Sequence, residues 1–233
     1  MRTIREILIA AVLATACCCG TAGAAVIQFS FTGQVTDVSD PPDFFGGAVV
    51  AGVTTVQGSF TFDTASAADG MPGDPTKANY PQVVTAASID FGPGFLFNQF
   101  QAATQTPDGL ETNDIQILDD PALDGWFMYG ALVPPGGYIF AELGISLTDS
   151  TATALTGDSI PTAAPVLADF DGRFFEFHLY VADTSIPGQS GVRLVDVYGV
   201  IDSLNEVPEP PALALFGMLG ALLLTRSRRP AAR

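Results

Sequence analysis

The sequence has little positive charge, one histidine, one tryptophan, and only three cysteines, which stand side by side near its start. Its 9 Lys and Arg residues face 25 Asp and Glu residues, so the formal net charge is −16. Nucleic-acid binding requires clustered Lys and Arg, so this charge balance excludes that class of function. Apolar residues make up 48% of the 233 residues, which excludes a wholly disordered chain and leaves room for one compact domain.

The first 25 residues have the three parts of a secretion signal. Arg2 and Arg5 supply positive charge, residues 7–16 form an apolar run, and residues 22–24 are small. We therefore expect export, with cleavage by signal peptidase near residue 24 or 25. The alternatives are a retained membrane anchor or a short buried helix, but the apolar run is brief for a membrane span.

All the cysteines, Cys17, Cys18 and Cys19, lie inside this signal. The exported chain then has no thiol, which excludes a disulfide, a cysteine nucleophile and a zinc–thiolate site. The alternative is that Cys17 accepts a lipid. Lipoprotein sites usually place Leu three residues before the cysteine, whereas this chain has Ala14 there.

The C-terminus also has three parts. The rigid segment Val207, Pro208, Glu209, Pro210 and Pro211 is followed by the apolar residues 212–224 and then by an arginine cluster. As a helix, the thirteen apolar residues span about 20 Å, and residues 208–225 span about 27 Å, against a bilayer core of about 30 Å. We expect a short transmembrane helix whose cytoplasmic stop is the cluster Arg226, Arg228 and Arg229.

This tail resembles the PEP-CTERM sorting signal of exported proteins in Gram-negative bacteria that make extracellular polysaccharide. Val207, Pro208, Glu209 and Pro210 match the motif, and the apolar stretch and arginine cluster follow in the family's order, whereas Pro211 lengthens the rigid segment. The resemblance implies that exosortase, a membrane-embedded cysteine transpeptidase, recognises the triplet and processes the protein there. The alternative is a plain C-terminal anchor behind an incidental proline-rich linker.

Alternating apolar and polar residues dominate the body, residues 26–206. Short strands of this kind, separated by Gly- and Pro-rich turns, predict an all-β fold. We expect one antiparallel β-sandwich or jelly-roll-like domain of about eight to ten strands, between an N-terminal signal helix and a C-terminal hydrophobic helix. The alternating apolar positions are Ile27, Phe29, Phe31 and Val35; Phe60 and Phe62; Ile115 and Ile117; and Phe175, Phe177, Leu179 and Val181.

The sequence predicts no catalytic residue. His178 is the only histidine, and it falls on the polar side of an alternating strand, which predicts a surface position. Residues 188–191 are one residue short of the Gly-x-Ser-x-Gly motif of serine hydrolases. We therefore expect a non-enzymatic protein, with a hydrolase as an alternative that no sequence feature favours.

Calcium is the only cofactor that the composition suggests, since 19 of the 25 acidic residues are aspartate. The candidate ligands are Asp119, Asp120, Asp124, Asp169 and Asp171. The last two begin a sequence similar to an EF-hand loop, but its fifth position is Arg173 and its twelfth is Tyr180, so it fails as one. Aspartate is also the usual residue of turns, where its carboxylate bonds to the main chain two residues on, and we expect that role for most of them.

The alternative function is an extracellular carbohydrate-binding module associated with exopolysaccharide. Trp126, Tyr129 and Tyr138 are the candidate contacts, since aromatic rings stack on sugars. The favoured hypothesis is an acidic envelope or extracellular-matrix protein that the C-terminal signal sorts. Its expected partners are signal peptidase, an exosortase-type transpeptidase, transiently the inner membrane, and exopolysaccharide.

Overall fold

The computed structural model describes residues 26–65, 67–103, 105–107, 110–134, 138–181 and 192–208. These residues contain ten β-strands and one short 3₁₀ helix. The strands are β1 (Val26–Ser39), β2 (Thr55–Asp63), β3 (Lys77–Tyr80), β4 (Val84–Asp90), β5 (Leu96–Phe97), β6 (Asp114–Asp120), β7 (Leu123–Leu132), β8 (Phe140–Asp149), β9 (Gly172–Val181) and β10 (Val192–Glu206), and the helix η1 is Leu167–Asp169.

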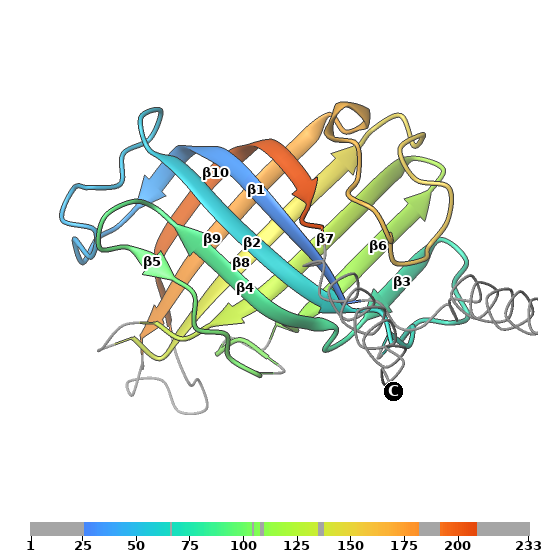
Figure 1. Cartoon of the computed structure of the whole chain (residues 1–233), viewed down its shortest axis with the longest axis horizontal. Helices are drawn as coiled ribbons and strands as arrows, with labels where there is room; N and C mark the ends of the chain where they lie inside the picture. The colour runs from blue at the N-terminus through green and yellow to red at the C-terminus, as the bar shows by residue number, and fades with distance from the viewer. Residues whose placement is uncertain are drawn as a thin grey trace, which may run out of the picture.

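All ten strands belong to one antiparallel sheet (Figure 1), with the order β3-β6-β7-β8-β9-β10-β1-β2-β4-β5. The prediction of an antiparallel all-β body is confirmed. The strands from β6 to β10 follow one another as neighbours in a meander, in line with the tendency of consecutive strands to pair. The predicted helices at the two termini lie outside the described residues.

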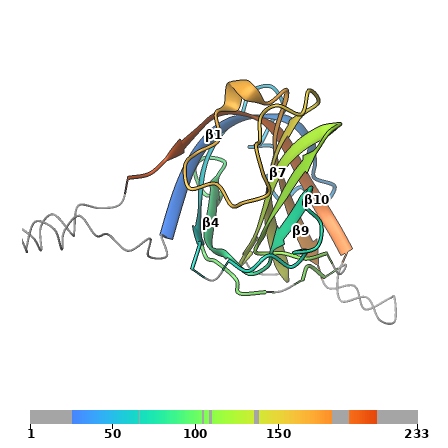
Figure 2. The same cartoon turned by 90° about the vertical axis from the view of Figure 1, so that its right-hand side faces the viewer.

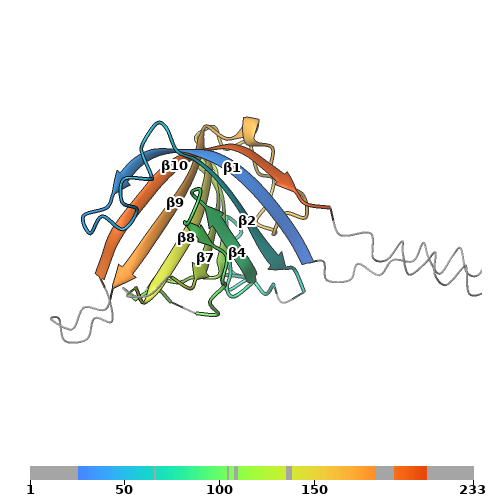
Figure 3. The same cartoon turned by 60° about the vertical axis from the view of Figure 1, so that its left-hand side comes forward.

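β1 and β10, the first and last described strands along the chain, pair with each other and join the two halves of the sheet. β1 pairs with β10 over ten register positions, from Phe29 opposite Glu206 to Ser39 opposite Asp196. The register shifts between Thr32 and Gly33 and between Val35 and Asp37, and such irregularities bend a strand and increase its twist. Both long strands curve over the top of the molecule (Figure 3), and the sheet turns back on itself.

Because the sheet curls, it forms two walls that face each other across one core (Figure 2). β4, on one wall, packs against β7 and β8 on the other. The core lies on the concave side, where alternate residues of every long strand are buried. Phe60 of β2 meets Trp126 of β7 with ring centroids 5.6 Å apart, so aromatic contacts join the two walls.

Two glycines make room for large aromatic rings where the sheet bends. A Cβ atom at Gly199 of β10 would overlap the ring of Phe175 and the carbonyl oxygen of Gln34, and one at Gly58 of β2 would overlap the ring of Phe31. Both rings are buried in the core. The curl therefore depends on positions that have no side chain.

We expect Gly199→Ala to lower the free energy of unfolding by about 1–3 kcal/mol, because overpacking forces rings and main chain apart. The control is Gly73→Ala, where a Cβ atom meets nothing within 4 Å. Urea unfolding followed by tryptophan fluorescence measures both variants. Equal midpoints for Gly199→Ala and Gly73→Ala would contradict this account of the bend.

Candidate functional site

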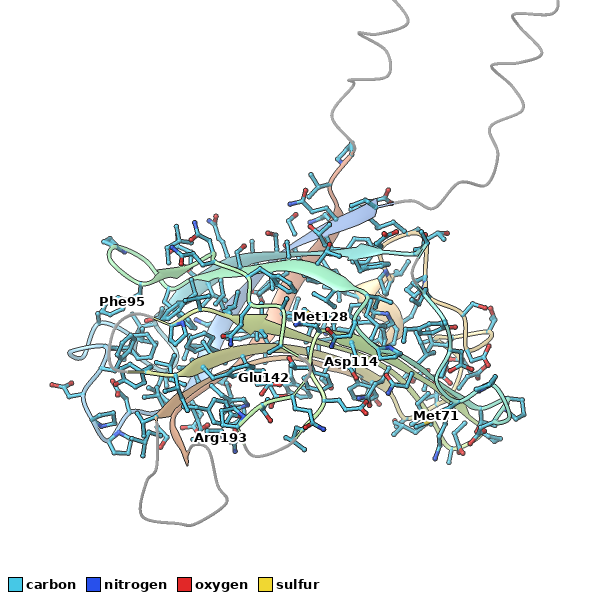
Figure 4. All side chains as sticks on the ribbon, turned by 90° about the horizontal axis from the view of Figure 1, so that it is seen from below. Met71, Phe95, Asp114, Met128, Glu142 and Arg193 are labelled. Atoms are coloured by element: carbon cyan, nitrogen blue, oxygen red, sulfur yellow. The ribbon has the colours of Figure 1, made fainter. Side chains whose placement is uncertain are left out.

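A strip of titratable side chains crosses the outer, convex face of the sheet, on the side away from the core. Cross-strand register places Asp114 opposite Tyr129, Tyr129 opposite Gly144, Gly144 opposite Glu176, and Glu176 opposite Tyr198. A second row, two residues away, runs from Glu142 through His178 to Asp196. These rows and Arg193 form what we call the outer-face strip: Asp114, Tyr129, Glu142, Glu176, His178, Arg193, Asp196 and Tyr198. Figure 4 shows Glu142 and Arg193 on one side of the ribbon and the core residue Met128 on the other.

His178 is the most contacted residue of the strip, and the prediction that it lies on the surface is wrong. Only 2% of the side chain is exposed. Its Nδ1 lies 2.8 Å from Asp196 Oδ1, and its Nε2 lies 3.3 Å from Glu176 Oε2 and 3.4 Å from an Arg193 nitrogen. Arg193 Nε also donates to Asp196 Oδ1 at 2.9 Å. The histidine is buried because this network satisfies its polar atoms on a face that sequence alternation assigns to solvent.

The strip perturbs the ionisation of its own members. The hydrogen bond from His178 is the main cause that holds the pKa of Glu176 below its ordinary value. Burial, with the negative charges of Glu176, Glu142 and Asp114, raises the pKa of Tyr129 to about 12. Burial is also the main cause that raises the pKa of Asp114. Groups with perturbed pKa values cluster at functional sites, and the strip is therefore a candidate functional site.

Chemically, the strip is suited to binding by hydrogen bonds. Arg193 is 39% exposed and Asp196 is 22% exposed, so both present polar atoms to solvent. Tyr180, beside the strip, donates to Glu142 Oε2 at 3.3 Å. The contacts of His178 are with charged groups and with the ring of Tyr198, whose centroid is 5.7 Å away. That arrangement holds strands β9 and β10 together and offers no base–nucleophile pair at His178.

The predicted sugar contacts do not form one platform, and the prediction fails at Trp126. That residue is fully buried and packs on Phe60, so its ring presents no face to a ligand. Tyr129 lies on the outer face of β7, in the strip. Tyr138 packs on Phe44, with ring centroids 4.9 Å apart. The alternation in β7 does place Trp126 and Tyr129 on opposite faces, as the sequence predicts.

The calcium candidates lie in two separate regions, the β6–β7 hairpin and the segment from η1 to β9, and do not converge. Asp119 and Asp124 lie opposite each other on β6 and β7, but Asp124 is buried and accepts the main-chain N–H of Leu155 at 2.8 Å. Asp171 accepts hydrogen bonds from the main chain and hydroxyl of Ser150. Asp120 accepts the N–H of Ala122 at 3.0 Å, and Asp169 belongs to η1. Within the described residues, no group of three or more His, Cys, Asp or Glu side chains is placed to hold a metal ion.

The expected turn chemistry is found at a third of the 19 aspartates of the sequence. Six aspartates accept the main-chain N–H two residues on, at 2.8–3.0 Å: Asp63, Asp69, Asp74, Asp90, Asp120 and Asp149. Asp149 goes further, because it also accepts the N–H groups of Thr153 and Ala154 at 2.8 and 3.1 Å. Asp40 accepts the N–H groups of both Phe44 and Phe45 at 2.8 Å. Aspartate carboxylates therefore hold many of the loops in a body without thiols.

The start of the predicted sorting motif lies at the end of the described chain. β10 ends at Glu206, and the N–H of Val207 donates to the carbonyl of Gln28 on β1 at 2.8 Å. Pro208 is the last described residue. The remaining predicted residues of the signal, Glu209, Pro210, Arg226, Arg228 and Arg229, lie outside the described residues. In the part of the chain that the structure describes, no helix is long and apolar enough to cross a membrane.

Sequence reasoning missed Glu142, Glu176, Arg193 and Asp196. The available signal was the position of Glu142 inside the apolar strand β8, because a carboxylate there has to find partners. Glu176, Arg193 and Asp196 each lie within 18 residues of His178 along the chain.

Comparisons with protein-family models, with curated proteins and with solved structures find no match for this chain.

The aspartate hydrogen bonds predict that the fold weakens in acid. The pKa values of Asp74, Asp149 and Asp171 are lowered, mainly by hydrogen bonds from Thr76, from Thr151 and Thr153, and from Ser150 respectively. A carboxylate whose pKa is lower in the folded state stabilises the fold above its unfolded pKa, and that stabilisation disappears as pH falls through the folded pKa. Asp114, whose pKa is raised, acts in the opposite direction. We expect the Tm to fall between about pH 5 and pH 2.

The matched variants are Asp149→Asn, which removes the charge that accepts three N–H groups, and Asp202→Asn on the exposed side of β10. Asp149→Asn lowers the Tm at pH 7 and makes its dependence on pH shallower, while Asp202→Asn changes neither. Calorimetry across this pH range measures both effects. A Tm profile that is identical in wild type and Asp149→Asn would contradict the role given to the turn carboxylates.

Proposed function

We propose that the protein is an exported, non-enzymatic envelope or extracellular-matrix component, sorted and processed by an exosortase-type transpeptidase at its C-terminal Pro-Glu-Pro signal. Signal peptidase removes residues 1–25, and residues 207–233 hold the precursor at the inner membrane. The proposal rests on the sequence of both ends and on their resemblance to the PEP-CTERM signal. Residues 26–206 are then the folded body of the mature protein.

The observation that best supports this division is the position of Val207. Its N–H still bonds to Gln28, so the sheet continues to the first residue of the motif. The proline that follows has no N–H and cannot extend the ladder in the same way. A folded body that ends at residue 207 leaves the Pro-Glu-Pro segment as its immediate neighbour, where a processing enzyme meets extended chain beside a rigid domain.

The architecture of the body supports a structural role. We infer that the two walls of the curled sheet act as the two layers of a β-sandwich around a core rich in phenylalanine. Aspartate carboxylates hold the turns, and the charge network around His178 holds β9 to β10. A body stabilised in this way needs no disulfide. Its strong negative charge keeps it soluble outside the cell.

Intact-mass measurement of the protein from a host that contains an exosortase tests the sorting proposal. We expect the wild type to lack residues 1–25 and the residues after the Pro-Glu-Pro triplet. The double variant Pro208→Ala, Pro210→Ala keeps its tail and remains in the membrane fraction, because the rigid extended segment is lost. The matched control is Pro211→Ala, which leaves the triplet intact and is processed as wild type.

Two results would overturn the sorting proposal. One is a wild-type protein that retains residues beyond Pro211 in that host. The other is normal processing of the double variant. In either case the protein would be an ordinary membrane-tethered β domain.

A carbohydrate-binding role is the second candidate, and one observation favours it. Phe174 of β9 exposes 50% of its surface. The register places it opposite Ser146 of β8, which lies opposite Phe127 of β7, so two aromatic side chains flank a small one on the outer face. Exposed aromatic rings on a sheet face stack on sugar rings. Phe174 and Phe127 therefore replace Trp126 as the candidate sugar contacts.

Co-sedimentation with the host's own exopolysaccharide tests this second role. We expect Phe174→Ala to weaken binding about tenfold, which corresponds to the ~1.4 kcal/mol that one stacking contact contributes. The control is Val166→Ala, a truncation at a residue that is 61% exposed before η1. If the wild type does not bind, or if both variants bind equally well, the carbohydrate-binding role is excluded.

A further inference from the structure

A hollow of about 200 Å³ opens at one end of the outer-face strip, where three segments of the chain meet. Its lining residues are Pro81 and Gln82 from the turn before β4, Gln105 and Glu111 from a short hairpin, and Thr112 and Asp114 at the start of β6. Gln105 and Glu111 face each other across an isolated antiparallel bridge. The hollow is separate from the sorting motif and from the five aspartates predicted to bind calcium.

Two buried oxygen atoms in the residues that line this hollow have no hydrogen-bond partner: Thr112 Oγ1 and Asp114 Oδ1. Thr112 is 1% exposed and Asp114 is fully buried. Gln116 donates to the other oxygen of Asp114 at 2.9 Å and leaves Oδ1 unpaired. Leaving a buried polar atom unpaired is costly, and a native fold that retains two together calls for a ligand there.

The side chains around the hollow offer oxygen atoms with free electron pairs, so they suit a ligand that accepts electron pairs. Glu111 and Asp114 contribute carboxylates, and Oε2 of Glu111 also accepts a hydrogen bond from Asn79 Nδ2 at 2.8 Å. The amide nitrogen of Gln82, another lining residue, donates to the carbonyls of Thr112 and Ala103, at 2.9 and 3.3 Å, so the amide oxygen is the atom of this side chain left to act as a ligand. None of the six lining residues is cationic.

We propose that this hollow binds a calcium ion through the oxygen atoms of Glu111, Thr112, Asp114 and Gln82. Carboxylate, hydroxyl and amide oxygens are the ligands of a hard cation, and calcium accepts irregular sets of them completed by water. Magnesium requires near-ideal octahedral geometry and suits the hollow less well. Two carboxylates give a low ligand charge, which places the expected Kd near 10⁻⁴–10⁻³ M. The ion ties the turn before β4, the hairpin and the start of β6 together.

Isothermal titration calorimetry of the full chain in mild detergent, after treatment with a chelator, tests the site with CaCl₂ and MgCl₂ as probes. We expect calcium to bind with one-to-one stoichiometry and at least tenfold more tightly than magnesium. Asp114→Asn weakens calcium binding at least tenfold. The matched control is Asp119→Asn, the same substitution on the same strand at one of the sequence-predicted candidates, and it leaves the Kd unchanged.

A stability measurement separates ligand binding from a purely structural role. In calcium-free buffer, Thr112→Val removes an unpaired hydroxyl at nearly constant shape, so its Tm equals or exceeds that of wild type. Added calcium then raises the Tm of wild type more than that of Thr112→Val. Absence of calcium binding by wild type, unchanged binding by Asp114→Asn, or loss of binding in Asp119→Asn alone would each overturn the proposal. None of these outcomes bears on the sorting of the protein.

Discussion

The pairing of the first strand with the last is the interaction on which the rest of the structure depends. β1 joins β10 in the middle of the strand order, so without this ladder the sheet would separate into β1-β2-β4-β5 and β3-β6-β7-β8-β9-β10. The same ladder allows β4 to face β7 and β8 across the core. Its two partners lie far apart in sequence, and such non-local pairing requires that most of the chain be in place. The end of the body, and with it Val207, the first residue of the proposed sorting motif, is fixed only when the whole domain has folded.

Many carboxylates of this fold bond to N–H groups close to them in space. Aspartates at turns accept main-chain N–H groups, and their short side chains suit that geometry better than glutamate does. On the outer face, the carboxylates of Glu176 and Asp196 each contact one ring nitrogen of His178, and Arg193 contacts Asp196. Asp114 and Asp124 depart from this pattern, because each has one buried oxygen without a partner. At Asp114 the unpaired oxygen lies in a residue that lines the hollow proposed for calcium.

The strands and the faces of their residues could be predicted because alternation is a local property of extended chain. Trp126 and Met128 on one face and Phe127 and Tyr129 on the other follow from the sequence alone. Burial of the polar face could not be predicted in this way. Tyr180 is buried because Ala103, from a distant loop, packs with it against Ala131 and Phe140. The hollow around Thr112 and Asp114 likewise arises from the meeting of three separate segments, whose contacts no periodicity reveals.

Amide hydrogen exchange of the full chain measures the central claim most directly, because it reports the strength of the β1–β10 ladder up to the sorting motif. The N–H of Val207, bonded to Gln28, is predicted to exchange as slowly as the amides at the end of β10, and far more slowly than the N–H of the exposed Gly73 in the turn before β3. The account is contradicted if Val207 and residues 202–206 exchange as fast as Gly73 while β6 to β9 stay protected. The motif would then follow a frayed strand, and the body would end before it.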